Sequence, residues 1–318
     1  MALTKEYLLA LKNLEGIGVK KLLKIGNYIE DRKLSISSVA DLVPVLMDNK
    51  IKVKKENVTI DMLEEALSSA KRSIDAHKRA GIGITTYYDE DFPAILRKTI
   101  NEEGKSDPPV ILYYKGDLSI TKMPGLAVIG TREFTDFGKK AGMFLAQEFA
   151  KRNFCIVSGL AIGCDTIGHK GALAVGGKTI AFLAHGLDTV YPPENTDLAQ
   201  QIVDNGGLLL SEYPIGMGVN RYYLVARDRL QAGMALATLV IQTGVKGGTM
   251  HAANTTLKAE KPLYTIKFQK AEQNEHEKSQ GNAELVKRGA KYLAGSDNLD
   301  EIAKDVLNYR KPQQTLFD

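Results

Sequence analysis

Residues 126–174 constrain the fold of this chain more than any other stretch. They read as an apolar strand at Leu126–Ile129, an amphipathic helix, a second apolar strand at Cys155–Val157, and a Gly-rich turn that opens another helix. Gly163 followed by Asp165 is typical of a helix N-terminus. Parallel sheets bind ligands at the carboxyl ends of their strands, where helix N-termini attract anions. The stretch therefore predicts a β-α-β-α unit and a phosphate-bearing ligand.

The alternation of strands and helices continues beyond this unit. Further strands are expected at Thr179–Ala184, Gly207–Tyr213, Thr238–Thr243 and Pro262–Lys267, with helices at Asp197–Asp204, Asp228–Leu236 and Met250–Ala259. This pattern predicts an α/β fold with a doubly wound, mostly parallel sheet.

Three domains are expected along the chain. Residues 1–80 should form a small helical domain of the helix-hairpin-helix or SAM-like kind. Residues 81–270 should form the Rossmann-like core, including antiparallel lead-in strands at its start. Residues 271–318 should form a linker, a short C-terminal element and a mobile tail. The polar run at 269–282 is expected to be a linker or an exposed loop.

Composition excludes several classes of protein. No apolar run reaches the roughly 18 residues of a transmembrane helix, and the first residues lack the layout of a signal peptide, so we expect a cytoplasmic protein. The two cysteines, Cys155 and Cys164, fall in the predicted core without a CxxC motif or a histidine cluster. Buried thiols are favoured over a disulfide or a metal site. No cofactor is expected.

The basic excess of the chain is N-terminal. The net charge is +4, and residues 1–80 hold 15 Lys and Arg against 11 Asp and Glu, a difference of +4, so the remainder is neutral. Gly16 and Gly18, followed by Lys20 and Lys21, are typical of a hairpin that grips a nucleic-acid phosphate through glycine amides. A packing element with solvated lysines explains the same pattern equally well.

Candidate binding residues follow the predicted strands, so the topology should bring them to one edge of the sheet. Glycine amides, hydroxyls and guanidinium groups are good phosphate ligands. The residues are Gly130, Thr131, Arg132, Ser158, Gly159, Arg227, Arg229, Lys246, Gly247, Gly248 and Thr249.

Catalytic signals are weak. Ser158 lacks a GxSxG elbow, and no GxxxxGK[ST] loop is present. Asp165 and His169 are four residues apart and would share a helix face, which suits a local hydrogen bond better than acid–base chemistry because no third member is visible. A protein that is not an enzyme is expected.

The motifs of the core resemble the DNA-processing protein A family, also called Smf, which has a Rossmann-like fold. The matching sequence segments are Gly130-Thr131-Arg132, 158–173, 176–195, Leu210–Pro214, Ala226–Arg229 and Lys246–Thr249. The lead-in at 91–93, 108–109 and 114–117 and the segment 285–290 also fit, so the resemblance covers roughly residues 81–305.

This resemblance implies a protein that binds and protects single-stranded DNA. It also implies dimerisation, assistance to a RecA-type recombinase, and a role in natural transformation, in recombination, or in a mobile-element or anti-phage system. Carried over by position, it implicates Arg132, Ser158, Gly159, His169, Lys178 and Arg227 near a basic pocket. Contacts of these types give affinity with little sequence preference.

The chain departs from the family pattern and resembles a divergent member. Asp228 stands where Asn is usual between two arginines, Lys246–Thr249 replaces a Ser-Gly-Ser text, and Tyr222–Val225 replaces a proline-containing lead-in. The related LOG nucleotide hydrolases use a PGGxGTxxE loop, whose glutamate is missing after Gly247-Gly248-Thr249. The alternative function is therefore a nucleotide sensor, or a nucleotide N-glycosidase that lacks its usual acid–base group.

The last residues carry a separate signal. Gln313, Leu316 and Phe317 match the Q-x-x-L-F pattern of tails that resemble those docking to a bacterial sliding clamp. The other interpretation is a terminus that packs on its own domain.

Overall fold

The computed structural model describes residues 3–53, 56–295 and 297–309 of the chain. The chain divides into two compact units. The first comprises residues 1–92 and 109–114, and the second comprises residues 93–108 and 115–318.

The first unit is mainly helical. Helices α1 and α4 pack together and bury leucines such as Leu8, Leu11 and Leu63. The unit contains α1 (Lys5–Asn13), α2 (Val19–Asp31), α3 (Val39–Asp48) and α4 (Ile60–Arg79), the two-residue strands β1 (Lys52–Val53) and β2 (Glu56–Asn57), and β3 (Gly83–Thr86). Strand β3 pairs antiparallel with residues 111–114 of β4 (Ile111–Gly116), as the lead-in predicted.

The second unit is built on seven parallel strands, which confirms the predicted doubly wound, mostly parallel sheet. The strands are β5 (Gly125–Ile129), β6 (Cys155–Ser158), β7 (Thr179–Leu183), β8 (Leu208–Ser211), β9 (Ala237–Val240), β10 (Leu263–Ile266) and β11 (Lys291–Leu293). Their order in the sheet is β11-β10-β9-β5-β6-β7-β8. Each of the first five is buried along its whole length, as expected of strands covered on both faces.

The strand order reverses beside β5. The chain runs outward from β5 through β6 and β7 to β8, and then returns to place β9 on the other side of β5. The turns that follow β5 and β9 therefore diverge at the carboxyl end of the sheet. Open α/β sheets bind their ligands at such a switch point.

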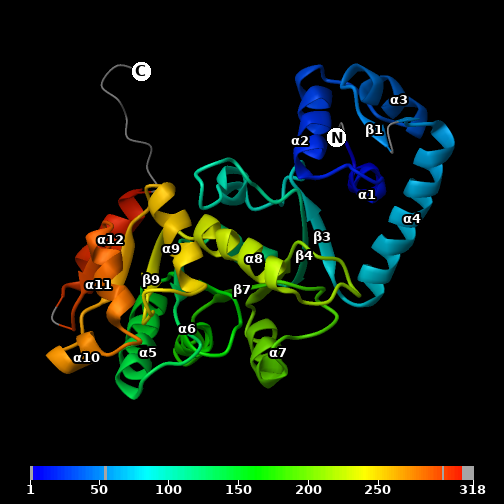
Figure 1. The fold of residues 1–318 in the computed structure, drawn as a ribbon. Helices are drawn as coiled ribbons and strands as arrows, with labels where there is room; N and C mark the ends of the chain where they lie inside the picture. The colour runs from blue at the N-terminus through cyan, green and yellow to red at the C-terminus, as the bar shows by residue number, and fades with distance from the viewer. Residues whose placement is uncertain (1–2, 54–55, 296, 310–318) are drawn as a thin grey trace. The chain divides into compact units, whose positions relative to one another are not determined.

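Helices cover both faces of this sheet (Figure 1). The helices α5 (Asp136–Lys151), α6 (Cys164–Leu173), α7 (Thr196–Asp204) and α12 (Leu299–Tyr309) lie on one face, and α8 (Arg221–Met234), α9 (Thr249–Lys258) and α11 (Gln280–Lys287) lie on the other. The short helices η1 (Ala94–Lys98), η2 (Leu118–Lys122), η3 (Pro193–Asn195) and α10 (Ala271–Glu275) lie in connections. Cys155 and Cys164 are buried free thiols, as predicted.

Two sequence expectations in this unit are wrong. Helix α8 begins at Arg221 and not at Asp228, because Asn220 caps it by accepting a hydrogen bond from the Tyr223 amide at 2.9 Å. The predicted linker at 269–282 contains α10 and the start of α11. Polar residues there serve the fold: Asn282 accepts from the Thr243 amide and donates to the Ile241 carbonyl, both at 3.0 Å.

Candidate nucleic-acid interface

A cavity of about 590 Å³ opens at the switch point of the sheet. Its walls come from the turn after β5, the turn after β9, the start of α6, and one face of α8. The lining residues include Gly130, Thr131, Arg132, Asp165, Arg221, Leu224, Val225, Arg227, Asp228, Lys246, Gly247, Gly248, Thr249 and His251. The structure thus brings together most of the residues that were predicted from separate parts of the sequence.

Gln242 holds the two turns at a fixed separation. Its carbonyl oxygen accepts from the Thr131 amide at 2.7 Å, and its side-chain oxygen accepts from the Thr135 amide and hydroxyl at 3.0 Å. Its side-chain nitrogen donates to the Ser279 hydroxyl at 2.9 Å. Because Gln242 is fully buried, these bonds have no competition from water.

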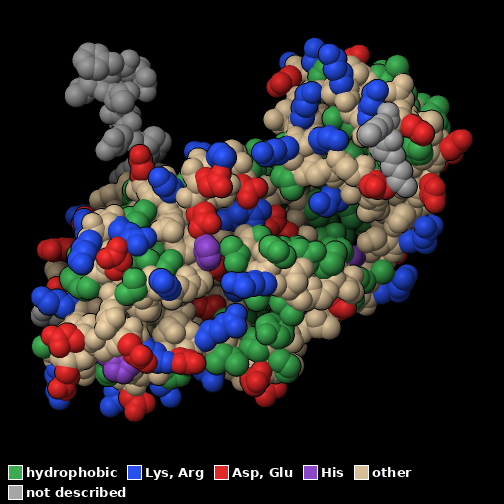
Figure 2. Space-filling view, viewed as in Figure 1, with side chains coloured by type: hydrophobic (Ala, Val, Ile, Leu, Met, Phe, Trp, Pro, Cys, Tyr) green, Lys and Arg blue, Asp and Glu red, His purple; other side chains and the backbone are tan. Residues whose placement is uncertain are grey.

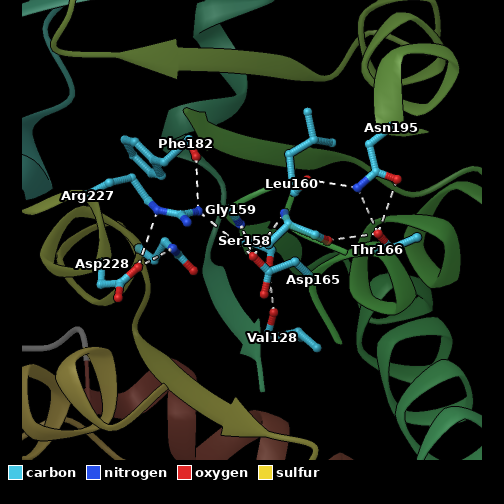
Figure 3. Close-up of polar contacts among 12 residues, drawn as sticks. Val128, Ser158, Gly159, Leu160, Asp165, Thr166, Phe182, Asn195, Arg227 and Asp228 are labelled. Atoms are coloured by element: carbon cyan, nitrogen blue, oxygen red, sulfur yellow. Dashed lines mark hydrogen bonds and ion pairs between the residues drawn. The ribbon is translucent and has the colours of Figure 1, made fainter. Parts of the chain in front are cut away.

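Arg227, Asp165 and Asp228 form a largely buried group in the wall of the cavity, which we call the inner cluster (Figure 3). Arg227 Nη1 donates to the Phe182 carbonyl at 3.2 Å and lies 3.8 Å from Asp165 Oδ2, while Nε lies 3.3 Å from Asp228 Oδ1. The Arg227 side chain is only 6% exposed. Its charge is therefore compensated by two carboxylates within the fold.

Gly159 leaves the space that Arg227 occupies. A Cβ atom at residue 159 would lie 1.2 Å from Arg227 Nη1 and 2.8 Å from Asp165 Oδ2. No small shift removes such an overlap, because the guanidinium group is enclosed by its partners. The role of Gly159 visible in the structure is to admit an arginine, in addition to lining a smaller cavity.

Asp165 shapes the turn between β6 and α6. Its Oδ2 accepts from the amides of Gly159 at 3.1 Å and Ala161 at 3.3 Å. Burial raises the pKa of this carboxyl, while Arg227 and these amides oppose the rise. Asn195 closes the turn by donating to the Leu160 carbonyl at 2.8 Å.

Asp228 faces the cavity from the middle of α8. Burial raises its pKa to about 6, and the neighbouring Asp165 also raises it, while Arg227, His251 and Arg132 act against the rise. Gln231 donates a hydrogen bond to its Oδ1 at 3.2 Å. This carboxyl therefore changes its charge near pH 6.

Three exposed cations line the same cavity: Arg132, Arg221 and Lys246. Within the described ranges, none of the three makes an ion pair with a carboxylate. The acidic Glu133 beside Arg132 is instead paired with Lys278. These three side chains, together with the amides of the Gly247-Gly248 turn, are free to bind an anion.

A second cavity of about 60 Å³ adjoins the first and shares Arg132 and Arg227 with it. Its other walls are mostly apolar, and they include Ile162, Leu183 and Tyr191. The binding region thus combines a charged chamber with a small apolar recess.

Two of the predicted residues, Ser158 and His169, are buried beneath the cavities. The Ser158 hydroxyl donates to the Val128 carbonyl at 2.7 Å. His169 Nδ1 lies 2.7 Å from the Thr179 hydroxyl, which itself donates to the Ile156 carbonyl, so Nδ1 carries the proton of a neutral ring. Burial lowers the pKa of His169 to about 3. Both side chains serve the fold, and Asp165 and His169 do not pair with each other.

Lys178 and Arg229 also lie apart from the cavities. Lys178 precedes β7, at the amino end of the sheet, and donates to the Asn205 carbonyl at 2.7 Å. Arg229 is buried, with two bonds of 2.8 Å to Glu212 and an ion pair of 2.7 Å with Asp107. The expectation that Arg229 is a phosphate ligand is corrected, since it lies inside α8 and its charge is already neutralised.

The N-terminal candidate residues belong to the first unit. Gly16 has φ +81° in the turn between α1 and α2, Gly18 precedes α2, and Lys20 and Lys21 lie in its first turn. Their contact with DNA stays a prediction. The predicted clamp-binding residues Gln313, Leu316 and Phe317 lie outside the described residues.

Arg221, Gln242 and His251 are part of this site although sequence reasoning did not select them. His251 bonds Glu102 at 2.7 Å. Arg221 follows Asn220, a helix N-cap residue, and that signal could have placed it in a first turn. Nothing comparable marks Gln242, whose importance depends on contacts distant in sequence.

Among residues 3–53, 56–295 and 297–309, no group of His, Cys, Asp and Glu is arranged to hold a metal, and no helix is both long and apolar enough to span a bilayer.

Comparison with known proteins gives a consistent result. Residues 83–306 match the family model of the DNA recombination-mediator protein A. The Smf protein of Synechocystis sp. is 30% identical over 304 residues, which is 92% of this chain and 71% of that protein.

Two solved structures of DNA processing protein A share the fold. The one from Streptococcus pneumoniae superposes with a TM-score of 0.74 at 28% identity, covering 95% of this chain and 99% of that one. The one from Helicobacter pylori, described for its single-stranded DNA binding mode, has a TM-score of 0.59 at 31% identity, covering 71% of this chain and 96% of that one. The resemblance seen in the sequence is confirmed: this chain belongs to the DNA recombination-mediator protein A family.

Proposed function

We propose that this protein binds single-stranded DNA in the cavity at the switch point of its sheet. The observation that carries the proposal is the set of three exposed cations, Arg132, Arg221 and Lys246, which line one cavity without carboxylate partners among the described residues. Cations and glycine amides bind phosphates irrespective of base sequence. The Helicobacter pylori relative, described for binding single-stranded DNA, supports the same function.

We extend this proposal to the physiological role. The protein protects single-stranded DNA and assists a RecA-type recombinase in DNA uptake, in recombination or in a related mobile-element or anti-phage system, and it acts in the cytoplasm as a homodimer. The similarity to the DNA processing proteins of Bacillus subtilis and Streptococcus pneumoniae supports this role.

The same proposal includes the absence of catalysis. Of the carboxylates that line the cavity, Asp165 and Asp228 lie against Arg227, and Glu133 is paired with Lys278. His169 is buried in its neutral form. An acid–base pair needs groups that reach the substrate and exchange protons with it. The proposed role therefore depends on binding alone.

A nucleotide-binding sensor or hydrolase is the second candidate. A cavity of about 590 Å³ has the volume of a small-molecule site, and the pKa of about 6 for Asp228 is suited to proton transfer near neutral pH. This alternative predicts that mononucleotides bind as tightly as a long strand, and a hydrolase would release free base from them.

The test is fluorescence anisotropy with a labelled single-stranded oligonucleotide, competed by duplex DNA and by mononucleotides at two salt concentrations. We expect tight, salt-sensitive binding that duplex and mononucleotides compete poorly, and a loss of about tenfold or more in Arg132→Ala. Lys178→Ala is the matched control, because Lys178 lies at the opposite end of the strands. Unchanged affinity in a folded Arg132→Ala protein would contradict the proposed site.

A further inference from the structure

The border of the cavity is unusually apolar for a charged site. Five hydrophobic side chains at this border have more than a third of their surface exposed. They are Ile162, Tyr191, Tyr222, Val225 and Val245. Ile162 and Tyr191 line the smaller cavity, Val225 lines the larger one, and Val245 precedes Lys246 in the turn after β9. Figure 2 shows hydrophobic side chains over α8 with Lys and Arg side chains beside them.

Tyr222 is the most exposed of these residues, with 84% of its surface accessible. Arg221, Leu224, Val225 and Asp228 line the cavity at the i, i+3, i+4, i+7 spacing of one helix face. Tyr222 directly follows Arg221 and is three residues before Val225, so it lies at the edge of that face.

The first turn of α8 holds Tyr222 on a fixed backbone. The ring of the next residue, Tyr223, stacks on Tyr213 with centroids 4.1 Å apart, and its hydroxyl contacts the Met217 sulfur at 3.8 Å. Asn220 caps the turn. A rigid helix that presents a free aromatic ring loses little conformational entropy when that ring is covered.

We infer that Tyr222 is a stacking platform for a nucleobase of the strand, and that this base lies just outside the cavity. The inference rests on the proposed function. Phosphates are complementary in charge to Arg132, Arg221 and Lys246. Since Tyr222 is next to Arg221 in the chain, it is placed to contact the base of a nucleotide whose phosphate binds Arg221. Every base has a π face, so stacking adds affinity without sequence preference. Because single strands expose their bases and duplexes do not, the platform also favours single strands.

A tryptophan probe tests this contact directly, since the chain contains no tryptophan. In Tyr222→Trp we expect affinity to be kept and indole emission to be quenched as an oligothymidylate is added. Phe144→Trp is the matched control, because Phe144 is exposed on α5 and does not line the cavities. Its emission should stay constant. Unquenched emission from residue 222 in a bound complex would overturn the inference.

Affinity measurements then separate stacking from other apolar contact. We expect Tyr222→Ala to weaken binding of an oligothymidylate about tenfold, with an unchanged salt dependence, and Tyr222→Phe to bind normally while Tyr222→Leu does not. An abasic strand of the same length should bind equally to the unaltered protein and to Tyr222→Ala. Arg132→Ala should weaken binding of both strands and reduce the salt dependence.

The outcomes distinguish this inference from the proposed function. If the unaltered protein binds no single-stranded DNA, the proposed function fails and the inference fails with it. If the protein binds normally and Tyr222→Ala or Tyr222→Leu is unaffected, the inference alone fails, and the apolar border is then a surface for a protein partner.

Discussion

The inner cluster and the exposed cations contain the same kinds of side chain in opposite surroundings. Arg227 is buried between two carboxylates, whereas Arg132 and Arg221, in the same cavity, are exposed and have none as a partner within the described part of the chain. A buried charge must be paired to be tolerated, and pairing makes it a structural element. An exposed, unpaired charge costs little to maintain and can bind an anion. An arginine that follows a strand is therefore a ligand only where the fold leaves it exposed and unpaired.

The largest effect is expected from removing the arginine of the inner cluster. Arg227→Met leaves Asp165 and Asp228 without their cation, and we expect the free energy of unfolding to fall by about 3–5 kcal/mol at pH 7. Urea unfolding measures this loss. Arg132→Met, which removes an exposed charge, should change stability by about 0.5 kcal/mol or less. Equal losses in the two variants would mean that the pairing of Arg227 with Asp165 and Asp228 does not stabilise the fold.

A smaller loss is expected from filling the space beside Arg227. Gly159→Ala places a methyl group on the guanidinium, so we expect about 1–3 kcal/mol of destabilisation from overpacking. Gly248→Ala is the matched control, because nothing lies within 4 Å of its added Cβ and its φ is −59°. Thermal unfolding should show a lower midpoint for the first variant only. A midpoint that is unchanged in Gly159→Ala would mean that Arg227 moves freely.

Among the exposed cations, Arg221 gives the sharpest test because sequence reasoning did not select it. Arg221→Ala should weaken single-stranded DNA binding by about 1 kcal/mol and lower the slope of log affinity against log salt by about 0.7, the value of one phosphate contact. Stability should stay unchanged. If Lys178→Ala reduced the slope while Arg221→Ala did not, the strand would follow a different surface.

The fold and the turns that carry two of the exposed cations could be predicted from the sequence. The periodicity of residues 126–267 predicted the parallel sheet, and parallel strands bring Gly130–Arg132 and Lys246–Thr249 to one edge whatever the details of packing. The prediction could not show which arginines are paired. Arg227 and Arg229 are two residues apart, and each is paired with a carboxylate from another element: Arg227 with Asp165 as well as the neighbouring Asp228, and Arg229 with Glu212.

Side-chain burial was equally hidden from the sequence. His169 and Lys178 both lie in sequence segments that resemble the family. In the structure His169 is buried beneath the edge of the sheet, and Lys178 lies at the amino end of β7. The predicted helix starts seven residues later than α8. The start of α8 contains Tyr222, Tyr223 and Val225, which are poor helix formers, and the cap at Asn220 was not recognised. Tertiary contacts, such as the stacking of Tyr223 on Tyr213, overrode this local preference.

The smallest effect is expected where the two regions meet, at Asp228. Because its pKa in the folded protein is about 6, above its ordinary value of 3.8, the folded state binds more protons than the unfolded state between these values. Asp228 therefore contributes stability below pH 4 that is lost as the pH rises through about 6.

Protonation of Asp228 also removes a negative charge beside the exposed cations. DNA binding should therefore strengthen by about 0.5 kcal/mol when the pH falls from 7.5 to 5.5. The charged groups that act on the pKa of Asp228 are Arg132, Asp165, Arg227 and His251, so the pH dependence is compared with that of Asp228→Asn, which keeps all four. This variant should bind more tightly at pH 7.5 and lose that advantage at pH 5.5. An identical pH dependence in both proteins would place Asp228 wholly within the inner cluster, without influence on the bound strand.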